Sequence, residues 1–357
     1  MLLLYTEDMS FRAWLSLVTV LLLAAILVGA RHELVHAWHL LGHVNLLILL
    51  LVIPTQMIVY YAGGAMIFSY IQSKGQMQKV SKWTQMRIAL EGNFVNHVLP
   101  SGGVSGVSYL SWRLGHLGIA PGRATMAQVV RYVMTFVAFA SLLLVALYAV
   151  TIDGTINRWI ILTSASLFGI IFLIVIAVIY LLSSKRRIDR FAVWIYHWAN
   201  SVVRRITFGR RRKIVDQDVI ENFLSDMHRD FLELRHDKKL LIKPYLWGLV
   251  FTIFDASIFM IAFWSFGEVF NPAPILIAYG VASLAGFIVL TPGGAGVYEA
   301  IMVTFLAFAG IAGDVAIAGI LLARVCILLI TILFGYFFYQ MSLNKYGDRD
   351  ANTKIHR

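Results

Sequence analysis

Long apolar runs dominate the chain, and six of them have the length that a membrane-spanning helix needs. A helix of about 20 residues crosses the ~30 Å hydrocarbon layer of a bilayer. The six runs cover Phe11–Ala30, Leu46–Tyr70, Ala124–Val150, Trp159–Leu182, Tyr245–Phe266 and Val315–Tyr339. The pattern therefore predicts an all-α polytopic membrane protein with six full transmembrane helices.

Two further apolar segments are interrupted near their middle by proline and glycine. The first runs from Ile88 to Leu117 around the letters LPSGGVSG, and the second runs from Ile275 to Ile311 around LTPGGAG. Each half is short for a complete crossing. We therefore expect each broken segment to be a re-entrant pair of half-helices or a tight two-crossing hairpin.

The composition excludes a water-soluble protein. Hydrophobic residues make up 59% of the chain and charged residues only 14%, with a mean hydropathy of +0.77. In a soluble protein the net charge of +11 would favour nucleic-acid binding. Here the basic residues mark membrane topology, so we expect no nucleic-acid partner. The single cysteine, Cys326, excludes a disulfide framework and a thiolate metal cage.

Basic residues indicate which connections face the cytoplasm. Connection 71–87 carries four basic residues and no acid, and stretch 184–243 carries 15 basic and 8 acidic residues. The positive-inside rule places both in the cytoplasm, together with the tail after Tyr339. The two broken segments should then enter the membrane from opposite faces, in a plasma-membrane protein whose C-terminus is cytoplasmic.

The two broken segments share an order of residues. Each has a proline and a glycine cluster, then a Gly-Ile pair, then an arginine in the following span. In the first segment these are Pro100, Gly102, Gly103, Gly106, Gly118-Ile119 and Arg131. In the second they are Pro292, Gly293, Gly294, Gly296, Gly310-Ile311 and Arg324. The order predicts inverted repeats: residues 11–150 with the re-entrant segment 88–117, and residues 158–341 with the re-entrant segment 275–311 and a cytoplasmic amphipathic insertion 184–243. Such matched breaks indicate a transporter site at the bilayer midplane. Close helix packing at glycine is the alternative reading.

The broken segments have the chemistry of an anion site. Where a helix starts, unpaired amide groups and the helix dipole attract phosphate, and glycine lets the backbone approach it. An arginine adds a charge with bidentate geometry. The expected headgroup-binding residues are Arg131, Arg324, Ser101, Gly102, Gly103, Ser105, Gly106, Thr291, Gly293, Gly294 and Gly296.

Three acids lie inside the apolar segments. Glu91, Asp255 and Glu299 each either neutralise an arginine or take part in substrate binding or proton coupling. We expect Glu299 to pair with Arg324, because both follow the second break. Asn93 and Asn96, together with His97, cluster with Glu91 just before the first break.

The segment HELVH matches the HExxH zinc pattern, with His32 and His36 one helical turn apart. The longer HExxHxxGxxH pattern fails, because position 39 is histidine and position 42 is glycine. The glycine motifs do not follow a strand, so they are not nucleotide loops. We therefore expect neither a metal nor a cofactor.

The insertion between the spans predicts two amphipathic helices. From Ile188, apolar residues recur at helical spacing among arginines, which suits a helix lying on an anionic leaflet. A second helix should run from Asp216 to about Arg235. With about 60 residues available, no separate catalytic domain fits here.

The motifs carry a family resemblance. The first break reads as an asparagine, LPSGG, a further glycine and, later, a Gly-Ile pair; the second reads TPGGAGVYEA, a Gly-Ile pair and ARV. This order resembles the lysylphosphatidylglycerol synthase membrane-domain family. That domain is the flippase-like half of the bacterial multiple peptide resistance factor, and it also occurs alone. The resemblance implies binding roles for Pro100, Gly102, Gly103, Pro292, Gly293, Gly294, Gly296, Glu299 and Arg324.

The resemblance implies translocation of aminoacylated phosphatidylglycerol from the inner to the outer leaflet. The sequence lacks the family's soluble aminoacyl transferase half, so we expect no enzyme activity. The expected function is flipping or scrambling of an anionic phospholipid, with a membrane phospholipid as partner. Two alternatives stay open: a membrane-embedded enzyme that uses HELVH or the Glu91 and His97 cluster, and a non-catalytic partner of a separate lipid synthase.

Overall fold

A computed structural model of the chain describes residues 42, 44–77, 79–99, 104–152, 158–206, 217–288 and 296–355. Helices joined by short turns make up these ranges, and they contain no strand. The expected first span, Phe11–Ala30, lies outside them. So do the residues at the centre of both predicted breaks.

Five long helices have the length and composition to cross a membrane. They are α4 (Val52–Ser73), which follows the short α3 (Leu46–Leu49), α7 (Pro121–Ile152), α8 (Arg158–Leu182), α11 (Ile242–Ser265) and α14 (Gly313–Ile355). Five of the six predicted spans are therefore confirmed as apolar helices of crossing length. Helix α14 continues beyond the end of the last predicted span at Tyr339, as far as Ile355. No proline follows Tyr339 in the sequence to stop it.

Each broken segment forms two shorter helices that pack against each other. The first gives α5 (Lys82–Val98) and α6 (Val104–Gly115), and the second gives α12 (Pro272–Ile288) and α13 (Val297–Phe308). The longer arms measure about 26 Å and the shorter arms about 18 Å. Local signals start these helices: Ser81 caps α5 by accepting a hydrogen bond from the Thr84 amide, and Pro272 occupies the first position of α12.

Four long helices form the centre of the molecule. α4 packs against α11, α7 and α14, and α11 packs against α7 and α14. The pair α5 and α6 lies against α4, α7 and α14, whereas α12 and α13 lie against α11, α7 and α14. Buried apolar side chains from these helices, among them Val59, Phe259 and Ile320, form the main core.

One end of the bundle gathers the basic connections. There α10 (Gln217–His236) follows α9 (Lys185–Ile206), which confirms the two predicted amphipathic helices. Buried Asp230 of α10 accepts hydrogen bonds from the Tyr70 hydroxyl (3.2 Å) and from the Arg123 guanidinium (3.3 Å). Lys74 pairs with Glu233, and its hydrogen bond lowers the pKa of the Glu233 carboxyl. The C-terminal end of α4 and the N-terminal end of α7 therefore both contact α10.

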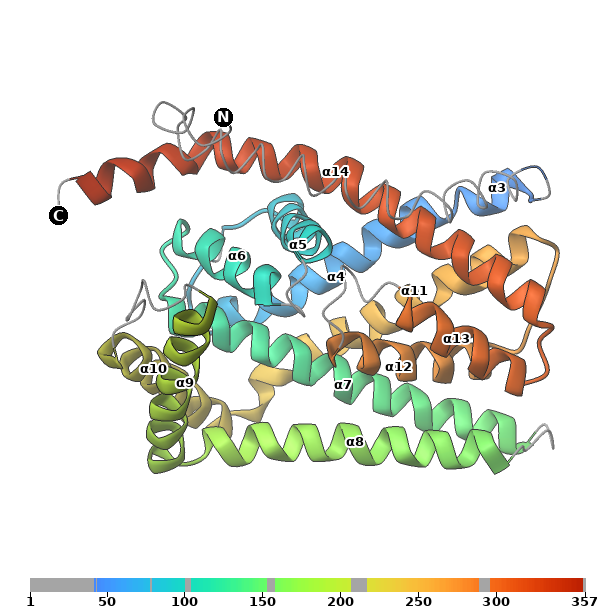
Figure 1. The fold of residues 1–357 in the computed structure, drawn as a ribbon, viewed down its shortest axis with the longest axis horizontal. Coiled ribbons are helices and arrows are strands. Elements are labelled where there is room, and N and C mark those ends of the chain that lie inside the picture. The colour runs from blue at the N-terminus through green and yellow to red at the C-terminus, as the bar shows by residue number, and fades with distance from the viewer. Residues whose placement is uncertain are drawn as a thin grey trace.

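The opposite end joins the start of α4 to the end of α11. The Asn45 amide donates to the Ser265 carbonyl at 2.7 Å. The first hairpin begins after α4 at the α10 end, whereas the second hairpin begins after α11 at the Asn45 end. In Figure 1, α6 accordingly lies towards α9 and α10, and α13 lies towards the start of α14. The two hairpins thus enter the bundle from opposite ends.

Candidate functional site

Arg324 is the centre of a charged site inside the bundle. It lies eleven residues past the start of α14, about 16 Å along the helix axis. Its Nε donates to Oε1 of Glu299 at 2.6 Å, and its guanidinium lies 4.5 Å from the centre of the Tyr298 ring. The predicted pairing of Glu299 with Arg324 is therefore confirmed.

The start of α13 supplies a second hydrogen-bond donor to the Glu299 carboxylate. Gly296 precedes the helix with φ of +88°, a left-handed conformation that glycine adopts without steric cost. Its amide donates to Oε2 of Glu299 at 2.6 Å. One carboxylate thus accepts from a guanidinium and from an amide at a helix start, and these are the donors expected to bind a phosphate. The protein's own Glu299 occupies them.

A second acid lies at similar depth. Asp255 is ten residues from the end of α11, about 15 Å along the axis. Its Oδ2 accepts a hydrogen bond from the Tyr279 hydroxyl of α12 at 2.6 Å. The charge of Arg324 also acts on Asp255. Helices α11 to α14 therefore each contribute a polar side chain here.

The first hairpin reaches the same place. His97 lies at the last turn of α5, where its Nδ1 contacts the Asn93 carbonyl at 2.9 Å, and the charge of Arg324 acts on His97 as well. The second hairpin thus contacts Arg324 directly through Glu299, and the first hairpin packs against α14, the helix that carries Arg324, although the two hairpins start from opposite ends. We call this group the central cluster; it consists of His97, Asp255, Tyr279, Tyr298, Glu299 and Arg324.

Arg131 occupies a different position. It lies ten residues past the start of α7, which is about 15 Å along the axis and thus at a depth comparable to that of Arg324. One turn earlier, the Gln128 amide donates to the Val107 carbonyl and to the Ser111 hydroxyl of α6, both at 3.1 Å. The guanidinium of Arg131 lies 5.4 Å from the Tyr132 ring centre. Within the described ranges, Arg131 makes no ion pair, and no contact joins it to Arg324.

Two predicted site residues of α6 serve hairpin packing. The Ser105 hydroxyl donates to the Val95 carbonyl of α5 at 3.3 Å. A Cβ on Gly106 would lie 3.0 Å from the Gly92 carbonyl and from Asn96 Cβ. The buried Asn96 Oδ1 beside it accepts no hydrogen bond from the part of the chain that the structure describes. Close packing accounts for Gly106.

Several predicted site residues lie outside the described residues. They are Pro100, Ser101, Gly102, Gly103, Thr291, Pro292, Gly293 and Gly294, together with His32 and His36 of HELVH. In the described ranges, no group of three histidine, cysteine or acidic residues could hold a metal ion.

A buried ionic cluster around Glu91 was not predicted as such. Glu91 is fully buried. Its carboxylate accepts from Arg87 at 3.0 Å, Tyr109 at 2.9 Å, Arg113 at 3.3 Å and Ser342 at 2.8 Å. Through these contacts, Glu91 links both helices of the first hairpin to α14. We call these five residues the Glu91 cluster.

Arg113 is buried although it lies near the end of the first broken segment. It is 1% exposed and lies 4.3 Å from the Tyr346 ring centre. The four-residue spacing of Arg87 and Glu91 was a readable signal for one pair. Nothing in the sequence connects Glu91 with Arg113, because the hairpin fold creates that contact.

Comparison with known proteins identifies the family. The family described as the lysylphosphatidylglycerol synthase TM region matches residues 13–335. The chain is also similar to a protein named UPF0104 membrane protein from Methanothermobacter thermautotrophicus, with 25% identity over 238 residues, which are 66% of this chain and 68% of the relative. The matched region includes the central cluster and, apart from Ser342, the Glu91 cluster. The chain therefore belongs to the family of the lysylphosphatidylglycerol synthase TM region.

Proposed function

We propose that this protein moves an anionic phospholipid between the two leaflets of the plasma membrane, by flipping or scrambling. One observation carries the proposal: two hairpins that enter from opposite ends of the bundle both pack against α14, the helix that carries Arg324. A headgroup that leaves either leaflet would meet the same charged site halfway. The acyl chains would stay in the hydrocarbon layer.

An inverted repeat in the packing supports this proposal. Matching α4 with α11, α5 with α12, α6 with α13, and α7 with α14 gives each contact a counterpart. For example, α5 lies against α14 and α12 lies against α7, while α6 lies against α7 and α13 lies against α14. We propose that both broken segments are re-entrant, with the α10 end in the cytoplasm. Inverted repeats of this kind allow alternating access around one fixed site.

Glu299 has a specific part in the proposed mechanism. Its carboxylate already accepts hydrogen bonds from the guanidinium of Arg324 and from the Gly296 amide. A headgroup phosphate, which prefers the same donors, has to displace this carboxylate. The exchange of one anion for another keeps the Arg324 guanidinium paired throughout, and the displaced Glu299 carboxylate then has to take up a proton or find another donor.

The direct test is leaflet exchange in vesicles that contain the purified protein. Fluorescent phosphatidylglycerol in the inner leaflet should become accessible to a membrane-impermeant quencher faster than in empty vesicles. Arg324→Gln should reduce the protein-dependent rate at least tenfold. The matched control is Arg229→Gln, which removes a mostly exposed guanidinium of α10 and should keep the full rate. Equal rates for wild-type protein, Arg324→Gln and empty vesicles would contradict the proposal.

Asp255 gives a reason to expect an amine in the headgroup. Glu299 balances Arg324, and the donor that contacts Asp255 is the neutral hydroxyl of Tyr279. An ammonium group would balance Asp255, and aminoacylated phosphatidylglycerol carries one beside its phosphate. A separate lipid synthase would then supply the substrate. Asp255→Asn should slow exchange of the aminoacylated lipid more than exchange of plain phosphatidylglycerol; equal slowing would contradict this assignment.

A further inference from the structure

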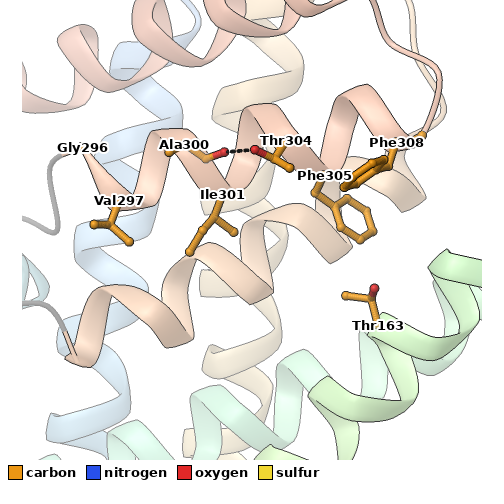
Figure 2. Close-up of a pocket in the computed structure, with 9 residues that line it drawn as sticks. Thr163, Gly296, Val297, Ala300, Ile301, Thr304, Phe305 and Phe308 are labelled. Atoms are coloured by element: carbon orange, nitrogen blue, oxygen red, sulfur yellow. Dashed lines mark hydrogen bonds between the residues drawn. The ribbon is translucent and has the colours of Figure 1, made fainter.

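An apolar groove runs along the outer face of α13. The cavity has a volume of about 450 Å³ and is lined by Thr163 of α8 and by Gly296, Val297, Ala300, Ile301, Thr304, Phe305, Phe308 and Ala309. Figure 2 shows Val297, Ile301 and Phe305 on one side of α13, with Thr163 facing Phe305 and Phe308. Its volume lies within the usual range of small-molecule sites, about 300–1,000 Å³.

The groove offers almost no polar surface to an occupant. The Thr304 hydroxyl donates to the Ala300 carbonyl of its own helix at 2.7 Å, as Figure 2 also shows. Phe308 is 67% exposed and Val297 is 39% exposed. A hydrated headgroup would lose its hydrogen bonds here without replacement. A hydrocarbon chain matches these walls.

The length and position of the groove agree with one lipid leaflet. Its lining extends from Gly296, before α13, to Ala309, after it, and α13 spans about 18 Å. Half of a ~30 Å hydrocarbon layer measures about 15 Å. One end of the groove adjoins the central cluster, since Val297 immediately precedes Tyr298 and Glu299. The other end reaches the level where α14 starts.

We infer that this groove binds one acyl chain of a phospholipid whose headgroup lies at the central cluster. This assignment rests on the proposed function and adds a second contact, because the chain follows α13 while the phosphate meets Arg324. The continuity of the groove with the charged cluster selects a lipid over a transmembrane helix. A helix about 10–12 Å wide with its side chains would have no polar group to place at the Gly296 end.

Photo-crosslinking tests the inference directly. Phospholipid vesicles containing the protein and a lipid with a diazirine in its acyl chain are irradiated, and the adducts are mapped by peptide mass spectrometry. Adducts at Ala300, Ile301 and Thr304 should exceed by at least fivefold those at Phe172 and Leu173, which are exposed on α8. A uniform distribution over both helices would overturn the inference.

A space-filling variant adds a matched comparison. Ala300→Trp places a large side chain in the groove and should reduce the α13 adducts at least fivefold. Leu173→Trp changes an exposed position of α8 and should leave them unchanged. Both variants should elute as monodisperse protein, and an Ala300→Trp protein that keeps the wild-type α13 adducts would contradict the groove. Wild-type exchange with uniform adducts removes only the acyl-chain site, whereas concentrated adducts without any exchange remove only the transport proposal.

Discussion

Arg324 and Glu299 form an ion pair at a depth where water is scarce, so each depends on the other. Both side chains are less than one-fifth exposed. Removing one partner leaves the other as an unpaired charge inside a membrane protein, and a charge at the centre of a membrane helix costs about 2.5–3.5 kcal/mol. The pair is therefore a good subject for a double-mutant cycle.

We expect Arg324→Gln to lower the thermal unfolding midpoint in detergent, and Glu299→Gln to do the same. The double variant Arg324→Gln/Glu299→Gln should recover more than half of the loss, because it leaves no unpaired charge. Strictly additive losses would show that the two side chains do not depend on each other for stability.

The Glu91 cluster makes a stronger prediction. Glu91→Ala leaves the buried Arg113 guanidinium without its carboxylate, which should destabilise the fold by about 3–5 kcal/mol. Ser342→Ala removes one hydroxyl donor to the same carboxylate and should cost about 1 kcal/mol. Unfolding monitored by Trp fluorescence can compare the two, and a Glu91→Ala protein as stable as Ser342→Ala would contradict the role of Glu91.

The two charge clusters differ in how far the sequence could predict them. Glu299 and Arg324 both follow the second break, so their pairing could be predicted from order alone. Glu91 and Arg113 lie on separate arms of a hairpin, and Ser342 lies 251 residues from Glu91. Only the packed fold brings these three together. Arg131 shows the reverse case: its matching position in the sequence does not give it the ion pair of Arg324 in the described ranges.

At the scale of helices, adjacent glycines of α4 have different environments. A Cβ on Gly64 would lie 2.5 Å from the Gln85 carbonyl oxygen of α5, whereas a Cβ on Gly63 would meet Phe251 at an ordinary 3.6 Å. Gly64→Ala should therefore separate α4 from α5 and destabilise the protein by about 1–3 kcal/mol. Gly63→Ala should be neutral or slightly stabilising, because alanine favours helix.

A comparison of thermal midpoints in the same detergent checks this pair. The control matters because both variants add the same methyl group to the same helix. Equal destabilisation by Gly63→Ala and Gly64→Ala would contradict the close packing of α4 on α5.

Most of the helices could be predicted from apolar run length, because a membrane requires about 20 apolar residues for each crossing. The helix boundaries could not be predicted as well from the sequence. Apolarity ends at Tyr339, but the polar residues up to Ile355 continue the helix. Conversely, the apolar run from Leu46 contains a turn at Leu50–Leu51, between α3 and α4, which hydropathy does not reveal.

At the scale of the whole molecule, the distribution of basic residues predicts which end faces the cytoplasm. Asp237 precedes α11 at the α10 end, and Glu268 follows α11 at the other end; both are exposed. In a Cys326→Ser background, Asp237→Cys and Glu268→Cys should react with an impermeant maleimide from opposite sides of the membrane. In intact bacterial-type cells, only Glu268→Cys should be labelled.

Labelling of both cysteines in intact cells would contradict the assigned topology. The charge rule predicted the grouping of segments 71–87 and 184–243 at one end, which the ion pair of Lys74 with Glu233 confirms. It could not predict that Asp230 would be buried between Tyr70 and Arg123, because that contact depends on how α10 docks on the bundle.

The uninterrupted length of α14 has a mechanical consequence. Arg324 connects this helix to the second hairpin, and Ser342 connects it to the first. The two residues are 18 positions apart, or about 27 Å along a continuous helix. A helix with an intact hydrogen-bond ladder moves as a rod. A shift that separates one hairpin from α14 is therefore transmitted along the helix to the other hairpin, so the two hairpins are mechanically coupled through α14.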